Sequence, residues 1–113
     1  MIDSVSFGAI VIDGTVYSSD VVLYPDGRVV DAWWRASGHR LTLADIDGLI
    51  SAAPEVIVAG TGVYGRLVPD ADLPAALSKQ GIEFFAAPNE QAMRIYNDAH
   101  RSKRAGACFH LTC

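Results

Sequence analysis

A run of four apolar residues that breaks into three closely spaced glycines constrains this chain more than any other feature. The run covers 56–59, and the glycines are Gly60, Gly62 and Gly65. A short apolar run bounded by glycine is typical of a buried strand that enters a tight turn. Ligands and partners of open α/β sheets bind at such turns, because glycine lets them approach the main chain. The segment therefore predicts a central parallel strand with a binding site at its carboxyl end.

Length and composition fit one α/β domain over residues 1–113. A chain of 113 residues can bury one modest core without disulfides. Hydrophobic residues make up 50% of the chain. This content favours strands that are buried on both faces rather than a sheet that exposes one face to solvent. Two cysteines close together in the sequence, Cys108 and Cys113, give no disulfide framework.

Charge and hydropathy exclude two classes of partner. The net charge is −4, whereas a nucleic-acid-binding domain carries a basic face. No stretch approaches the roughly 18 apolar residues that a transmembrane helix needs. The first residues resemble neither a signal peptide nor a transit peptide. We expect no nucleic-acid partner, no membrane insertion and a cytoplasmic location.

Strand signals fill the first third of the chain, and helices alternate with strands after it. Asp13-Gly14 and Pro25-Asp26-Gly27 are hairpin turn signals. A capping box at 42–45 starts a helix that ends before Pro54, and Asp72 with Pro74 starts a second helix that Gly81 closes. Strands are expected at 82–86 and 105–111, with a third helix between them. The alternation predicts a three-layer α/β domain with an added antiparallel hairpin portion.

Residues 28–34 are expected to form one continuous strand. Alternation along this strand gives two faces: Val30, Ala32 and Trp34 on one, and Val29, Asp31, Trp33 and Arg35 on the other. The first face has the more apolar composition. We therefore expect Trp34 in the core, with Trp33 and Arg35 more exposed.

The three glycines match the G-x-G-x-x-G spacing of a dinucleotide site, but their context does not. A dinucleotide-binding helix begins within that motif, whereas residues 66–69 intervene here before any helix signal. No acid for the ribose follows the next strand. We expect no bound cofactor. The glycines serve either tight backbone turning alone or a pocket or partner surface.

The loop from Trp33 to Arg40 gathers indole, guanidinium and imidazole groups before a helix. Arg35 and Arg40 could hold an anion, Trp33 could stack on a ligand, and His39 could transfer a proton. Alternatively, these side chains only fix the loop. No nucleophile or second base accompanies His39, so we assign no catalytic residue.

The last six residues hold two cysteines and a histidine. On a strand Cys108 and His110 share a face while Cys113 lies on the other, and two ligands do not make a closed zinc site. We therefore expect no metal site, with Cys108 as a buried apolar residue and Cys113 as a peripheral thiol.

Several short phrases, each weakly specific, together resemble one family across nearly the whole chain. They are Phe7-Gly8, Ile12-Asp13-Gly14, residues 24–29, Trp33-Trp34-Arg35 with Gly38-His39, Gly60-Thr61-Gly62 and residues 110–113. The family comprises small archaeal and bacterial proteins of unknown function related to the adipogenesis-associated domain protein, and includes a mitochondrial assembly factor for respiratory complex I (NADH dehydrogenase alpha-subcomplex type). The resemblance implies a central, mixed, mostly parallel sheet of about five strands and no established activity or cofactor.

Two functional hypotheses follow. The chain is either a non-catalytic interaction or assembly-accessory protein, with a partner such as a membrane-complex subunit, or a binder of an anionic or nucleotide-like small molecule, including an enzyme. Both hypotheses use two segments that we expect to adjoin at the strand ends. The candidate site residues are Trp33, Arg35, His39, Arg40, Gly60, Thr61, Gly62, Tyr64 and Gly65.

Overall fold

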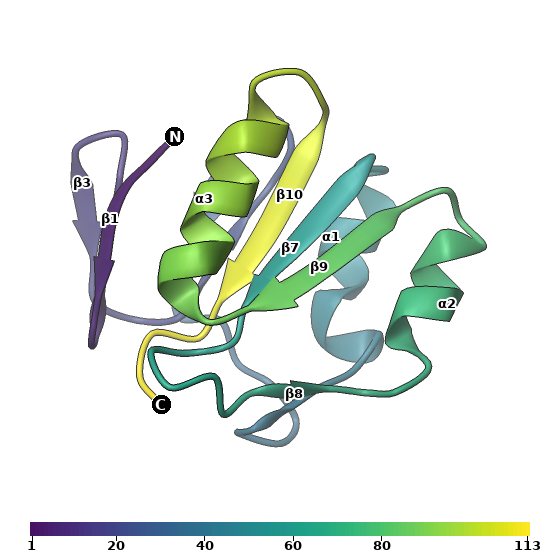
Figure 1. The fold of residues 1–113 in the computed structure, drawn as a ribbon, viewed down its shortest axis with the longest axis horizontal. Coiled ribbons are helices and arrows are strands. Elements are labelled where there is room, and N and C mark those ends of the chain that lie inside the picture. The colour runs from purple at the N-terminus through teal and green to yellow at the C-terminus, as the bar shows by residue number, and fades with distance from the viewer.

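A five-stranded mixed sheet forms the middle layer of the computed structural model, which describes residues 1–113 (Figure 1). The strand order is β5-β4-β10-β7-β9. Strands β10, β7 and β9 run parallel, and β4 and β5 are antiparallel additions at one side. The bounds are Val21–Leu23 for β4, Val29–Val30 for β5, Val56–Gly60 for β7, Glu83–Ala87 for β9 and Ala105–Phe109 for β10.

Strand β7 lies inside the sheet, between the parallel strands β10 and β9, as its apolar run predicts. Every residue of β7 and of its neighbour β10 is buried. Val56 and Val58 pack into the core on one face of the sheet, while Ile57 and Ala59 pack into the core on the other. A strand with apolar residues at successive positions is stable only where both faces are covered, so the sequence of β7 requires a three-layer arrangement.

Helices cover both faces of this sheet. Helix α3 (Asn89–His100) lies over one face (Figure 1), and its residues Ala92 and Tyr96 belong to the hydrophobic core on that face. The short 3-10 helix η1 (Ala44–Ile46), helix α1 (Asp47–Ser51) and helix α2 (Leu73–Ser78) supply buried residues to the other face. The predicted capping box is present, since the Thr42 N–H donates to Asp45 Oδ2 at 2.9 Å and the Asp45 N–H to Thr42 Oγ1 at 3.4 Å.

The N-terminal strands form a separate antiparallel sheet of three strands, β1 (Ile2–Ser6), β2 (Ala9–Ile12) and β3 (Thr15–Tyr17). This sheet packs beside α3, where Asn97 bonds both the N–H and the C=O of Ile2 at 2.8 Å. Ile10 and Ile12 join the α3-side core. The fold is therefore the predicted three-layer α/β domain with an antiparallel hairpin portion.

Two strand predictions were too long. The strand expected over 28–34 ends at Val30, because Ala32 takes a left-handed conformation with φ +53° and the ladder stops there. The strand expected over 105–111 ends at Phe109. Both errors shift the side-chain parity on which the predicted strand faces depended.

One small sheet was not predicted. Strands β6 (Arg40–Leu41) and β8 (Val68–Pro69) pair in parallel, and thereby connect the two loops that follow Trp33 and Gly60. The longest helix, α3, has 12 residues, and no helix is both long and apolar enough to cross a membrane.

Candidate functional site

Three segments far apart in the sequence meet at the carboxyl end of the parallel strands. They are the loop 33–40, the turn 60–65 and the segment 110–113 that follows β10. The N–H of Val63 donates to the C=O of Thr112 at 2.8 Å, and the N–H of Val68 to the C=O of His39 at 2.9 Å. These backbone bonds hold the three segments together, the loop 33–40 through Val68, which lies just after the turn. We call the three segments together the carboxyl-edge site.

The glycine turn is tightly enclosed at two of its positions. A Cβ on Gly60 would clash with the Phe109 ring and lie 2.6 Å from Asn89 Oδ1. Gly62 has φ +106°, and a Cβ there would lie 2.5 Å from the backbone carbon of Cys113. These close approaches explain why glycine occupies both positions. Thr61 is buried beside them, and its N–H donates to the C=O of Ala87 at 2.9 Å.

The side chain of Asn89 connects the glycine turn to the segment after β10 by hydrogen bonds. This side chain is buried, with 1% of the residue exposed. The Gly62 N–H donates to Asn89 Oδ1 at 3.0 Å, and Asn89 Nδ2 donates to the C=O of His110 at 2.7 Å. One amide thereby satisfies two backbone groups that would otherwise be buried without partners.

Beneath the loop lies a charged network of Asp20, Arg35 and His110. Arg35 Nη1 donates to Asp20 Oδ2 at 2.9 Å, and His110 Nδ1 lies 2.9 Å from the same oxygen. The N–H of Leu111 donates to Asp20 Oδ1 at 2.8 Å. Burial alone would raise the pKa of Asp20, but the hydrogen bonds from His110, Leu111 and Arg35 outweigh it, and the pKa lies below its ordinary value. Asp20 is therefore a carboxylate held by three donors.

The loop itself differs from the prediction at its two tryptophans. Trp34 is 85% exposed, whereas Trp33 is half-buried against the core, with its Nε1 donating to the C=O of Asp45 at 3.0 Å. The side chain of Arg35 keeps only 6% of its surface exposed and lies over the Trp33 ring at 4.7 Å. The expectation was wrong, because the break at Ala32 reverses which residues face inward.

A cavity of about 280 Å³ opens beside this network. The residues that line it come from the segment before β4 and from the loop after β5: Ser19, Asp20, Ala32, Trp33, Trp34, Arg35 and Gly38. Its volume is close to the lower limit of small-ligand pockets, which is about 300 Å³. The cavity is thus the concave part of the carboxyl-edge site.

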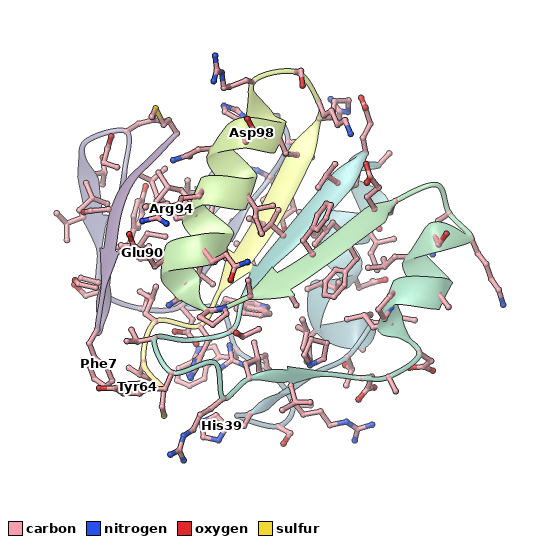
Figure 2. The ribbon with its side chains drawn as sticks, in the orientation of Figure 1. Phe7, His39, Tyr64, Glu90, Arg94 and Asp98 are labelled. Atoms are coloured by element: carbon pink, nitrogen blue, oxygen red, sulfur yellow. The ribbon has the colours of Figure 1, made fainter.

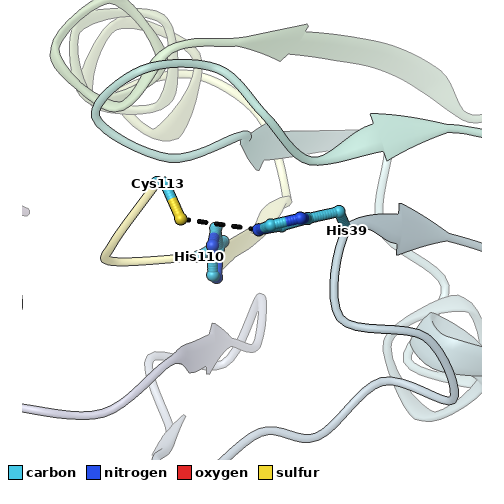
Figure 3. A group of neighbouring side chains, drawn as sticks. All are labelled: His39, His110 and Cys113. Atoms are coloured by element: carbon cyan, nitrogen blue, oxygen red, sulfur yellow. Dashed lines mark hydrogen bonds between the residues drawn. The ribbon is translucent and has the colours of Figure 1, made fainter.

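Two histidines and a cysteine lie close together in the site (Figure 3), with His39 exposed, His110 buried and Cys113 half-buried. One potential ligand atom from each of His39, His110 and Cys113 lies within 4.8 Å of the others, and Cys113 Sγ is 3.5 Å from His39 Nε2. Strand parity predicted that Cys113 lies away from His110, and that prediction fails because β10 ends at Phe109. Cys108 instead is fully buried, and burial raises its pKa to about 12, so it remains a thiol.

Large aromatic side chains are exposed around the glycine turn. Figure 2 shows Phe7 and Tyr64 next to each other, and their ring centroids are 6.3 Å apart. Phe7 is 61% and Tyr64 71% exposed. The position of Phe7 next to Tyr64 is fixed by the backbone, because the N–H of its neighbour Gly8 donates to the C=O of Leu111 at 2.9 Å.

The predicted residues thus have different roles in the structure. His39, Thr61 and the glycines lie in the carboxyl-edge site, while Tyr64 lies on its outer surface. Arg40, on β6, pairs with Asp70, the residue after β8, at 2.6 Å and takes no part in the charged network. Sequence reasoning missed Asp20, Asn89, and the grouping of His110 with Cys113. Their position in the sequence was the available signal: His110 is the residue after β10, and Asn89 lies two residues after β9, so both are polar residues at the carboxyl ends of parallel strands.

Comparison with known proteins places these features in a wider group. A family model described as a protein of unknown function (DUF498/DUF598) matches residues 2–110. Among solved structures, the conserved hypothetical protein PH1505 of Pyrococcus horikoshii OT3 is similar, with 26% identity, a TM-score of 0.86, and coverage of 100% of this chain and 99% of that chain.

Two further structures show the same fold. The protein MT938 has 25% identity and a TM-score of 0.84, with 100% of this chain and 98% of that chain covered. A Mth938-like domain protein of Bordetella pertussis has 20% identity and a TM-score of 0.66, with 97% and 84% covered. The arrangement of sheet, helices and hairpin portion is thus shared with these proteins.

Proposed function

Because this chain belongs to the DUF498/DUF598 family of proteins of unknown function, we propose a function from its own surface: it is a non-catalytic protein-binding accessory protein. The observation that carries this proposal is the pair of exposed aromatic side chains, Phe7 and Tyr64, beside the glycine turn. Tyrosine, tryptophan and phenylalanine are enriched in protein interfaces, and a few such side chains supply most of the binding energy.

The aromatic pair is held in place before any partner binds. The Gly8 N–H to Leu111 C=O bond fixes the turn that carries Phe7. Tyr64 sits between Gly62 and Gly65, whose N–H donates to the C=O of Gly62 at 3.2 Å. Preorganised side chains lose little conformational entropy on binding, so more of the contact energy appears as affinity. Trp34, from the loop 33–40, adds a third exposed aromatic side chain to the protein's surface.

The polar groups of the site support a binding role rather than a chemical one. Arg35 and Asp20 bond each other, and the side chain of Asn89 bonds backbone groups through both its oxygen and its nitrogen. These residues support the loops that carry the aromatic side chains. The resemblance to the family of the complex I assembly factor favours a subunit of a membrane complex as the partner.

The test is capture of a partner by variants that keep the fold. The double variant Phe7→Ser, Tyr64→Ser should lose at least roughly 90% of a protein that the parent captures from a lysate of its source organism, because loss of two central aromatic contacts removes most of the binding energy. Val16→Ser is the matched control, because Val16 on β3 is 63% exposed and lies outside the proposed surface. Equal capture by the double variant and the control would contradict the proposal.

A second candidate function rests on the cavity beside Trp33 and Arg35. Its volume of about 280 Å³ suits a small ligand, and its walls combine indole rings with a guanidinium and a carboxylate. A ligand bound there would contact Trp34 and change its fluorescence. Saturable quenching by a small anion or nucleotide, abolished in Trp34→Ala, would support this candidate.

A further inference from the structure

The cluster of His39, His110 and Cys113 is used neither by the proposed protein-binding surface nor by the core. Each of the three side chains comes from a different part of the carboxyl-edge site: the loop before β6, the residue after β10, and the segment that pairs with the glycine turn. The two imidazole rings lie edge to face, with centroids 5.7 Å apart. We propose that these three residues form a Zn²⁺ site.

The spacing of the ligand atoms fits zinc. Tetrahedral zinc with bonds of about 2.3 Å to sulfur and about 2.05 Å to nitrogen separates the two ligand atoms by about 3.6 Å. The distance from Cys113 Sγ to His39 Nε2 is 3.5 Å. All three potential ligand atoms lie within 4.8 Å of one another.

The hydrogen bonds of His110 leave one ring nitrogen for a metal. Its Nδ1 lies 2.9 Å from Asp20 Oδ2 and 3.0 Å from Arg35 Nη2, and a metal bound at Nε2 selects the tautomer in which Nδ1 carries the proton and donates it to the carboxylate. Nε2 then presents its lone pair toward the cluster, where the Thr112 hydroxyl lies at 3.3 Å. Zinc-binding histidines commonly donate their second nitrogen to a carboxylate in this way, which fixes the ring and makes it a better ligand.

Two imidazoles and a thiolate favour zinc over magnesium and calcium. Two imidazoles and one thiolate are ligands of borderline softness, which Zn²⁺ prefers over the oxygen ligands that Mg²⁺ and Ca²⁺ require. Coordination uses the thiolate form of Cys113. Arg35 lies at the Nδ1 side of His110, at 3.0 Å, and so stays away from the metal position. Three protein ligands would leave the fourth position of a tetrahedral zinc for a water molecule.

The experiment uses Co²⁺ as a coloured substitute for Zn²⁺ on protein freed of metal and kept reduced. The parent should bind one equivalent and show the thiolate-to-cobalt charge-transfer absorption, which Zn²⁺ then displaces. Cys113→Ser should lose that absorption, and His39→Gln should bind at least about tenfold more weakly, because each variant removes one of only three protein ligands. His39 is exposed, Cys113 is half-buried, and neither belongs to the hydrophobic core, so both variants should fold, and their melting curves check this.

His100→Gln is the matched control. His100 ends α3 and stacks on Tyr96 at 5.3 Å, outside the cluster, so this variant should bind cobalt as the parent does. The zinc site is refuted if the parent shows no charge-transfer absorption. It is also refuted if either Cys113→Ser or His39→Gln binds cobalt as tightly as the parent does, because the metal then lies elsewhere.

Discussion

Replacing Gly62 by alanine tests how the glycine turn holds the carboxyl-edge site together. The added Cβ meets two separate costs. The first is the left-handed backbone at φ +106°, which for a residue with a side chain costs about 1–3 kcal/mol. The second is contact with Cys113, whose backbone carbon and oxygen would lie 2.5 Å and 2.6 Å from the new atom.

The two costs can be separated with a matched glycine. Gly27 has φ +91°, but a Cβ there meets nothing within 4 Å, so Gly27→Ala measures the backbone cost alone. Overpacking of a closed site adds about 1–3 kcal/mol. We therefore expect Gly62→Ala to lower the free energy of unfolding by about 2–6 kcal/mol in total, and by about 1–3 kcal/mol more than Gly27→Ala.

Urea unfolding followed by circular dichroism gives both values from the transition midpoints. The Gly62 variant should also shift the NMR signals of 110–113, because that segment must move to admit the Cβ. Equal destabilisation by the two variants, with residues 110–113 unshifted, would refute the reasoning about the contact with Cys113.

Three further predictions concern side chains around the site. Asp20→Asn should lower the free energy of unfolding by about 1.5–3 kcal/mol at pH 7. Folding lowers the pKa of Asp20, so this contribution is present above the ordinary pKa of 3.8 and is lost as the pH falls through the folded value. The urea midpoints of variant and parent should therefore converge in acid. Asn89→Ala should cost about 1–3 kcal/mol for each of the two backbone groups that it leaves unpaired, measured in the same way, and an unchanged midpoint would contradict the assigned role. Trp33→Phe should lose the hydrogen bond to Asp45 and about 0.5–1.5 kcal/mol of the free energy of unfolding, whereas Trp34→Phe should stay within about 0.5 kcal/mol of the parent. Thermal melts in which Trp34→Phe is the more destabilised variant would contradict the exposed position of Trp34.

Local signals predicted the elements that local chemistry determines. The capping box at Thr42, the apolar run of β7 and the positive φ of Gly62 depend on residues close in sequence, and the structure contains all three. The layer arrangement follows from them, because a strand that is apolar on both faces needs covering on both sides. The three-layer fold was therefore predictable from the sequence.

The charged network was not predictable in the same way. Asp20 and His110 are ninety residues apart, and nothing near either residue indicates the other. The exposure of Trp34 depended on one residue, Ala32, whose left-handed φ ends β5 early; alanine gives no signal of such a conformation. The clustering of Cys113 with the histidines likewise depends on where β10 ends. Long-range contacts and strand ends limited the prediction of the site.

Site-specific photo-cross-linking tests the central claim, that this protein acts by binding another protein through the surface around Phe7 and Tyr64. A photoreactive phenylalanine analogue replaces Tyr64 in one strain of the source organism and Val16 in another, since both positions are similarly exposed. We expect a discrete covalent adduct with one partner from position 64 and none from position 16. No adduct from position 64, or the same adducts at equal yield from both positions, would contradict it.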